Sequence, residues 1–379
     1  MLDPIVNFVT RIFGLLGRAI GFLVGIVLWP FLWLGRWYAQ RGWMLKAALG
    51  AVLLILIGLY ANFFYATQWW NNFNPDYPAA MRQQKSVSVA GGPVAGNTGA
   101  AATGSASQAP ASCQPSAIAG ISAELIDFNV NQNSWVSSMV VSKMGFFGID
   151  WRRTPFFDNK AAFQLGINQV MRRTTTELVD TLGRVRGTSQ IDQNLQDART
   201  ALAWNEDAWY LGWRGPTRPT PSVYREAIGK LRAYNTSLEK CQVTFDARAD
   251  NLMQFLDRIA GDIGSTSDIL RSRIDASDAG WFDLRADDRF WFAYGQLYAY
   301  YGVLVAARSD FAAVIAERNL NTLWARMEEQ SRAALNVQPW IISNGSESSA
   351  FFPSHLATMG FNMLQVRSNI VEIRSVLDR

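Results

Sequence analysis

The longest apolar run of the chain lies near its N-terminal end. Residues 47–66 read AALGAVLLILIGLYANFFYA and contain no charged side chain. A helix of this length crosses a hydrocarbon core of ~30 Å. Trp43 and Lys46 precede the run, and Trp69 and Trp70 follow it, as interfacial aromatic residues and a basic cytoplasmic flank do. The pattern predicts a transmembrane helix over 43–70.

The residues before this span are mostly apolar but have a narrow polar face. Small and polar residues recur at spacings of three and four, which puts them on one side of a helix: Asn7, Arg11, Gly14, Arg18, Gly21 and Gly25. This favours an amphipathic helix within 1–42 that lies in the membrane interface. The alternative is a short second span or a re-entrant segment over the uncharged residues 19–35. Two arginines on the narrow face favour the interfacial helix.

The sequence after the span changes in composition. Residues 86–123 carry no charge, and their centre is rich in Ala, Gly, Ser and Pro. Such a composition cannot bury enough apolar surface to fold. We therefore expect a disordered linker over 71–120 that tethers a distal domain, residues 121–379, to the membrane.

The distal region has helical periodicity. One predicted helix follows Asp158 as its N-cap and continues through Phe163 and Ile167. The last helix is the most regular, with an a/d stripe of apolar residues: Leu356, Met359, Met363, Val366, Ile370, Ile373 and Leu377. The stripe fits an intermolecular coiled coil or a face packed within the chain's own bundle, and we favour the bundle. The predicted fold class is mainly α.

Charge is distributed unevenly along the chain. The formal net charge is +4, from 35 basic and 31 acidic residues. Residues 1–46 hold five basic groups, among them Arg36, Arg41 and Lys46, and one acidic group, so 5 − 1 = +4 lies before the span. The positive-inside rule then predicts a cytoplasmic N-terminus and a distal domain outside the cytoplasm, with the lipid bilayer as partner. The neutral distal region argues against nucleic-acid binding.

Candidate chemistry is sparse. The single histidine, His355, excludes a multi-histidine zinc site, and the chain has no phosphate-binding loop motif. We predict no catalytic residue, no cofactor and no metal ligand. Cys113 and Cys241 fit either one disulfide or two free thiols, and their spacing does not decide between them.

Two segments have residues suited to a ligand or partner. Asp283, Asp287 and Trp291 lie in WFDLRADDRFWF, where carboxylates beside aromatic rings suit a glycan. The commoner explanation is helix capping and a buried aromatic layer. Arg184 and Arg186 precede a predicted helix start and suit an anion, although a solvated turn is commoner.

Four blocks of the sequence resemble a known family. NKAAFQLGINQVMRR (159–173), LGRVRGTS (182–189), DARADNLMQFLDRI (246–259) and GWFDLRADDRFWFAYGQLYAYYGVL (280–304) are similar to the bacterial family called domain of unknown function 2333. The resemblance implies a membrane-associated bacterial protein with no assigned activity. It also implies that the membrane is the inner membrane and that the compartment beyond the span is the periplasm. We expect a non-enzymatic scaffold or interaction protein of the cell envelope, with a protein partner or self-association. The alternative is a periplasmic glycan-binding or glycan-acting protein that uses segment 281–301.

Overall fold

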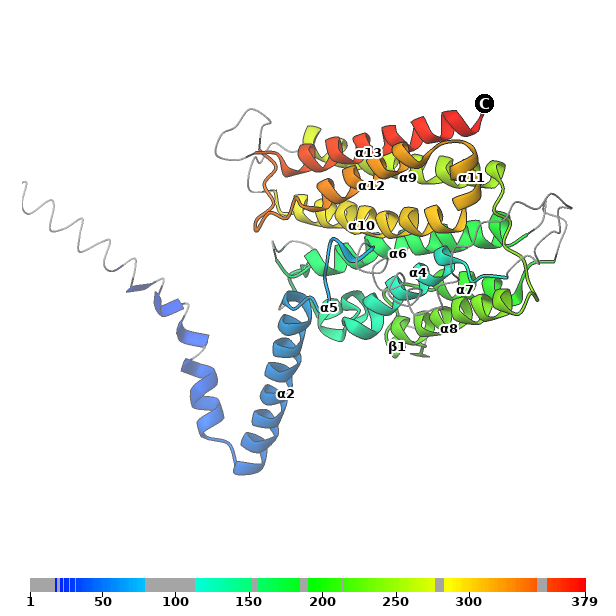
Figure 1. Ribbon diagram of the computed structural model, residues 1–379. Coiled ribbons are helices and arrows are strands. Elements are labelled where there is room, and N and C mark those ends of the chain that lie inside the picture. The colour runs from blue at the N-terminus through cyan, green and yellow to red at the C-terminus, as the bar shows by residue number, and fades with distance from the viewer. Residues whose placement is uncertain are drawn as a thin grey trace, which may run out of the picture. The chain divides into compact units, whose positions relative to one another are not determined.

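The computed structural model describes residues 18, 21–22, 24–26, 28–30, 32–78, 113–146, 148–151, 154, 156–184, 190–212, 215–276, 283–345 and 353–379. The chain forms two compact units, residues 1–62 and residues 63–379. Helices dominate the described residues, which confirms the predicted mainly α class (Figure 1).

The first unit contains most of α2 (Trp43–Gln68), the helix that holds the predicted span. Its middle is apolar on all sides, and Leu53, Leu54 and Ile55 each expose more than half of their surface, at 58%, 70% and 62%. Among the described residues, α2 is the helix that is long and apolar enough to cross a membrane. The predicted interfacial helix over 1–42 lies largely outside the described residues, although residues 32–39 are helical.

The second unit is a helical domain. Its helices are α4 (Ala117–Asp127), α5 (Val140–Met144), α6 (Asn159–Glu177), α7 (Gln193–Leu202), α8 (Thr220–Glu239), α9 (Ala249–Asp275), α10 (Ala286–Asp310), α11 (Ala312–Glu317), α12 (Asn321–Leu335) and α13 (His355–Leu377). Extra residues form π-helical turns at the ends of α4 (Phe128–Gln132) and α6 (Leu178–Leu182). Two short strands, β1 (Leu211–Gly212) and β2 (Gly215–Pro216), pair antiparallel.

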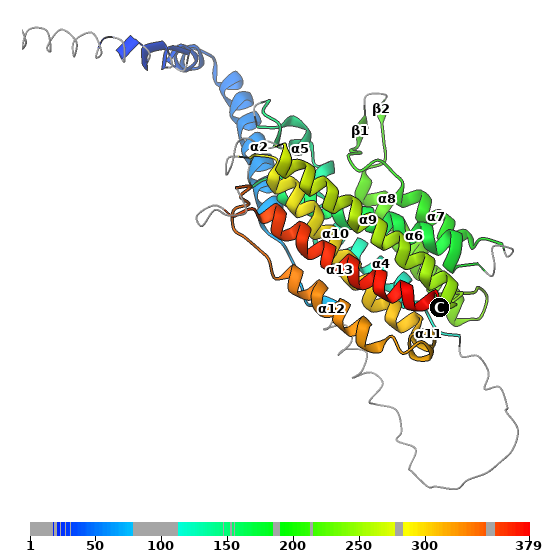
Figure 2. The same ribbon diagram turned by 90° about the horizontal axis from the view of Figure 1, so that it is seen from above.

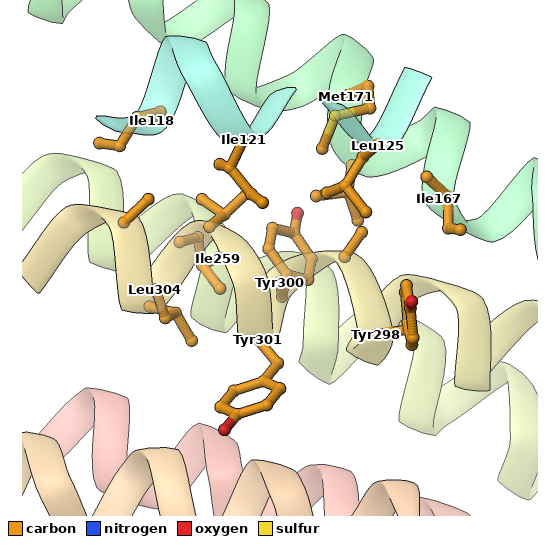
Figure 3. Close-up of a cluster of buried hydrophobic side chains, with 14 of the residues drawn as sticks. Ile118, Ile121, Leu125, Ile167, Met171, Ile259, Tyr298, Tyr300, Tyr301 and Leu304 are labelled. Atoms are coloured by element: carbon orange, nitrogen blue, oxygen red, sulfur yellow. The ribbon is translucent and has the colours of Figure 1, made fainter. Parts of the chain in front are cut away.

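Helix α10 occupies the middle of this domain. It packs against α9, α12 and α13 on one side and against α4 and α6 on the other (Figures 1 and 2). Helices α7 and α8 pack beside α6 and α4. Figure 3 shows the core where Ile121 and Leu125 of α4 meet Tyr298 and Tyr300 of α10.

A pair of glycines allows α6 and α10 to approach closely. A Cβ atom on Gly166 would overlap the carbonyl oxygen of Phe292, and a Cβ on Gly295 would overlap the carbonyl oxygen of Phe163. Each helix therefore presents its backbone to the other at the crossing, which a side chain at either position would prevent.

Buried tyrosines of α10 have partners for their hydroxyl groups. Tyr294 donates to the carbonyl of Leu335 at 2.7 Å, and Tyr300 donates to the Asp262 carboxylate at 2.7 Å. Because an unpaired buried hydroxyl costs free energy, these bonds let large aromatic side chains fill the centre of the domain.

The predicted stripe of the last helix is buried within the chain. The stripe residues are at most 6% exposed, and α13 packs on α9 and α12. Ser354 is the N-cap and accepts a hydrogen bond from the amide of Ala357 at 3.2 Å. The structure thus agrees with the bundle interpretation of the stripe.

The domain begins inside α2. Phe63, Ala66 and Thr67 are 1%, 4% and 2% exposed. We call residues 63–78 the strap, because they run from the last turn of α2 along the domain core. Lys160 of α6 donates to the carbonyl oxygens of Ala66 at 2.8 Å and Trp69 at 2.6 Å, and so satisfies free groups at the end of α2.

Aromatic side chains hold the strap in place. Trp70 lies 5.1 Å from Trp291 between ring centroids, Phe73 lies 5.7 Å from Tyr298, and Tyr77 stacks on Tyr298 at 4.5 Å. The hydroxyl of Tyr77 also donates to the carbonyl of Tyr298 at 3.0 Å, above Gly302. The aromatic residues of the strap therefore pack against the domain core.

This arrangement corrects the predicted domain boundaries. The sequence predicts a linker over 71–120 between the span and a domain that begins at residue 121. The structure instead assigns residues 63–78 and residues 113–120 to the domain. Residues 79–112 lie outside the described residues. The low-complexity run therefore follows the first part of the domain and does not separate the domain from the span.

Candidate functional site

A cavity of about 840 Å³ opens on the second unit beside the first turns of α6 and α10. Its volume lies within the range of ~300–1,000 Å³ that small-molecule sites occupy. Segment 136–151, the turn at Glu206 and Asp207, and the start of the strap complete its wall. The apolar part of the lining includes Phe63, Trp151, Phe157 and Phe292.

Asp158 is the most unusual residue of the cavity lining. Asp158 is 4% exposed, both carboxylate oxygens are shielded from solvent, and the neighbouring carboxyl of Asp288 is within hydrogen-bond reach. It occupies the predicted N-cap position of α6 but forms no side-chain cap hydrogen bond. Burial raises the pKa of Asp158 to about 10, and the carboxylates of Asp288 and Asp287 add to this rise. Burial and the neighbouring carboxylates therefore favour the protonated form of Asp158.

Two acidic residues at the start of α10 face Asp158. Asp288 lines the cavity. Asp287 is 5% exposed, and burial, with the charge of Asp288 second, raises its pKa to about 7. Three carboxyl groups from two helix starts thus share one corner of the domain, and their mutual repulsion disfavours full ionisation.

Basic side chains also line the cavity. Arg285 and Arg289 flank the acidic pair at the start of α10, and Lys143 comes from α5. Arg285, Arg289 and Lys143 are exposed, whereas Asp158 is buried. The cavity therefore has an acidic interior group and basic groups toward solvent.

Asp283 has a different role from the one that a glycan site needs. It forms an ion pair with Arg273 and accepts hydrogen bonds from Asn344 at 3.0 Å and from the amide of Arg285 at 3.2 Å. Burial opposes the ionisation of Asp283, but these hydrogen bonds outweigh it and lower its pKa. Asp283 is a structural carboxylate that joins α9, the start of α10 and the segment before α13.

Trp291 packs inside the domain and does not line the cavity. It is half-buried beneath Trp70 of the strap and next to Tyr294, at 5.3 Å between ring centroids. Asp283, Asp287 and Trp291 therefore do not converge on the open cavity. Trp281 and Phe282, at the start of the same predicted segment, lie outside the described residues.

The basic pair of the predicted anion site is described in part. Arg184 follows the π-helical turn that ends α6, whereas Arg186 falls in 185–189, outside the described residues.

The predicted anchoring residues fall into two groups. Trp43 is 76% exposed, Lys46 donates to the carbonyl of Ala39 at 2.9 Å, and Arg41 lies 4.8 Å above the Trp37 ring. Arg36 lies in the helical stretch 32–39. Trp69 is 60% exposed, whereas Trp70 is partly buried and packs against the domain core, where the sequence predicted an interfacial residue.

The two cysteines form a disulfide. Cys113 and Cys241 have Cα atoms 5.5 Å apart across a separation of 128 residues. Cys241 has a positive φ of 57° just after α8. The bond ties the residues before α4 to the end of α8, which answers the question that the spacing left open.

His355 has a structural role. Its Nδ1 accepts the amide hydrogen of Ser343 at 2.9 Å, and burial lowers the pKa of the imidazole. Its neutral form thus fixes the segment before α13. Within the described residues, no group of three or more His, Cys, Asp or Glu could hold a metal ion.

Sequence reasoning missed Asp158 and Lys160 as functional candidates. The sequence pattern presented Asp158 as a capping residue and gave Lys160 no particular role. The signal that distinguishes them is burial, which depends on the strap and on α10, both distant in sequence.

One comparison with known proteins gives a result. Residues 134–280 match the model of a family described as an uncharacterized protein conserved in bacteria, domain of unknown function 2333. No curated protein and no solved structure matches the chain. The match covers Asp158, Glu206 and helices α5 to α9, and it confirms the resemblance found in the sequence. Residues 134–280 of the chain are therefore similar to this bacterial family.

Proposed function

We propose that the protein is a membrane-anchored, non-enzymatic scaffold or interaction protein of the bacterial cell envelope. The observation behind the proposal is that the aromatic residues of α10 pack against the strap. The strap, which continues from the membrane helix, packs its aromatic rings against Trp291, Tyr294 and Tyr298. These rings hold the domain together, so they are not available to stack on a glycan.

Two observations support a periplasmic domain. The disulfide between Cys113 and Cys241 suits an oxidising compartment. The excess of basic residues before α2 suits a cytoplasmic N-terminus. A phosphatase reporter fused after Arg379 should be active, and a reporter fused at residue 42 should be inactive. Activity at residue 42 would contradict this topology.

The interaction role is tested in intact cells. The tagged full-length chain is crosslinked in the membrane, purified and analysed by mass spectrometry, with an unrelated tagged inner-membrane protein as control. We expect envelope proteins or additional copies of this chain to be enriched over the control. Hydrolysis of isolated envelope glycan by the purified full-length chain would refute the non-enzymatic role and favour the glycan alternative.

A further inference from the structure

Large apolar side chains are exposed where the second unit begins. Three lie at the end of α2 and four in the segment from the end of α5 to residue 156, and each exposes between 45% and 60% of its surface: Phe64, Tyr65, Trp69, Met144, Phe146, Ile149 and Phe156. We call these seven residues the exit surface. Single exposed apolar residues are common, but a cluster of them marks a contact with a partner or a membrane.

The two parts of the exit surface are fixed to each other. The ring of Phe64 lies 5.7 Å from that of Phe157 between centroids. The side-chain amide of Gln68 donates to the carbonyl oxygen of Phe156 at 2.9 Å. The segment that follows α5 therefore packs directly on the last turn of α2.

A tight turn presents Phe146 and Ile149. The amide of Phe146 donates to the carbonyl of Ile149 at 2.8 Å, and the amide of Ile149 donates back to the carbonyl of Phe146 at 3.0 Å. Gly148, within the turn, has a φ of 92°, which suits glycine. The buried Trp151 supports the turn, with its ring 5.8 Å from that of Phe146. The turn thus exposes apolar side chains on a backbone whose facing groups are paired, as entry into a bilayer requires.

The position of the span indicates what covers this surface. The uncharged run of α2 ends at Ala66, two residues before the helix ends at Gln68. Phe64 and Tyr65 thus lie where the membrane-crossing run ends, at the level of the bilayer surface. Because a helical turn rises only ~5.4 Å, residues that pack on this turn lie close to the same surface. The lipid is already adjacent to the exit surface, whereas a protein partner would have to displace it.

We propose that the exit surface lies in the headgroup region of the bilayer, so that the domain rests on the membrane from which α2 emerges. Side chains of this kind enter the boundary between headgroups and acyl chains by ~5–10 Å. Lys143, exposed next to Met144, suits the lipid phosphates. The proposal goes beyond the scaffold role, rests on α2 as the membrane anchor, and applies to either side of the membrane.

A fluorescent label on a single cysteine measures the depth of the surface. The two native cysteines pair with each other, so an introduced cysteine is the one reactive thiol. The full-length Ile149→Cys chain carries the fluorophore NBD in phosphatidylethanolamine–phosphatidylglycerol nanodiscs, with one copy per disc so that no second chain can cover the label. Doxyl-labelled lipids should quench its fluorescence strongly and aqueous iodide should quench it little. The reverse result would overturn the proposal.

Two further label positions separate docking from anchoring. Val371→Cys places the label on α13, across α10 from α5, at a side chain that is 41% exposed, and iodide alone should quench it (Figure 1). Leu54→Cys places the label in the middle of α2, where lipid alone should quench it. A Leu54 label in lipid with an Ile149 label in water would overturn docking and leave the anchor intact. Both labels in water would refute the anchor and the proposal with it.

A pair of variants tests the side chains of the surface. Phe146→Asp replaces an apolar ring with a charge, so the lipid quenching of the Ile149 label should be lost. Phe361→Asp is the matched control on α13, because Phe361 is 61% exposed and Phe146 is 48% exposed. The melting temperatures of both variants should stay close to that of the parent, which separates loss of docking from loss of folding. Unchanged quenching in Phe146→Asp, or equal loss in both variants, would overturn the proposal.

Discussion

Helices α10 and α13 lie side by side in one domain but are buried in different ways. Of the 25 residues of α10, 17 are buried, and they occupy every side of the helix. Of the 23 residues of α13, eight are buried, and seven of these form its apolar stripe. The outer face of α13 meets solvent, with Phe361 at 61% and Leu364 at 46% exposure.

The difference shows two routes to stable helix packing. Helix α13 needs one apolar face because it has neighbours on one side. Helix α10 has neighbours all around, so it needs small residues where backbones approach and satisfied hydroxyls where tyrosines are buried. Substitutions should therefore be more damaging on α10 than on α13, and they should act by different mechanisms.

The largest effect is expected from Gly295→Ala in α10. The new methyl group would overlap the carbonyl of Phe163 in the rigid α6 backbone, which cannot move aside locally. We expect a loss of about 4 kcal/mol or more in unfolding free energy, at the severe end for overpacking. Denaturant titration of the purified chain measures it.

Gly261→Ala is the matched control for this substitution. Gly261 lies in α9, and nothing lies within 4 Å of its added methyl group. This change should stabilise the protein by about 0.5–1 kcal/mol, through helix propensity alone. Equal effects at both sites would show that the α6–α10 crossing is looser than described.

The next effect is expected from Ile370→Ala in α13. Ile370 is fully buried in the stripe, so truncation should cost about 2–5 kcal/mol. The loss should not depend on protein concentration, because the stripe packs on α9 and α12 of the same chain. Val371→Ala, at a 41% exposed neighbour, should change the stability little. A concentration-dependent melting temperature would instead indicate a coiled coil between chains.

A stabilising change is expected beside the start of α10, from Asp158→Asn. The pKa of Asp158 is about 10 in the folded protein and near 3.8 in the unfolded chain, so folding favours its protonated form. Its contribution to stability is fully present below pH 4 and is lost progressively as the pH rises toward 10. Asparagine imitates the protonated acid and avoids this loss. The variant should be more stable than the parent chain at pH 7, and this gain should vanish at pH 4. A gain that is independent of pH would show that Asp158 is ionised in the folded protein.

The smallest effect is expected from Ser354→Ala at the N-cap of α13. It removes the acceptor of the Ala357 amide and should cost about 1 kcal/mol. Ser368→Ala, at an exposed position of the same helix, should cost nothing. In α10, by contrast, the stability should not depend on the N-cap side chain, because the N-cap residue, Arg285, forms no side-chain cap hydrogen bond. A neutral Ser354→Ala would show that packing alone sets the start of α13.

The sequence was sufficient where one local pattern determined the structure. The apolar run of α2 and the apolar stripe of α13 were enough to predict both helices. The surroundings of α2 are the same all around its axis, and those of α13 are the same along its buried face. The mainly α class followed from the same periodicity. The burial of α10 was suggested by its aromatic residues, although no stripe on that helix indicated which neighbours would cover it.

The strap could not be predicted, because the sequence of these residues fits a membrane interface as well as it fits a protein core. A tryptophan just after a span suits a lipid interface and a protein core equally well. In the structure Trp69 is exposed, whereas Trp70 is partly buried against the domain core. The candidate site had the same problem. Asp158 becomes unusual through Asp287 and Asp288, some 130 residues away, and no local pattern reports that contact.

The strap also makes the domain a composite of two separable pieces of chain. One piece ends at residue 78 and the other begins at Cys113, and both ends lie on the same folded unit. Doubling the length of a connecting segment costs only ~0.6 kcal/mol in loop closure. The protein is thus suited to fragment complementation: a membrane-inserted N-terminal piece should recruit a separately made C-terminal piece through Trp70, Phe73 and Tyr77. A guest domain inserted between the pieces should leave the helical domain intact.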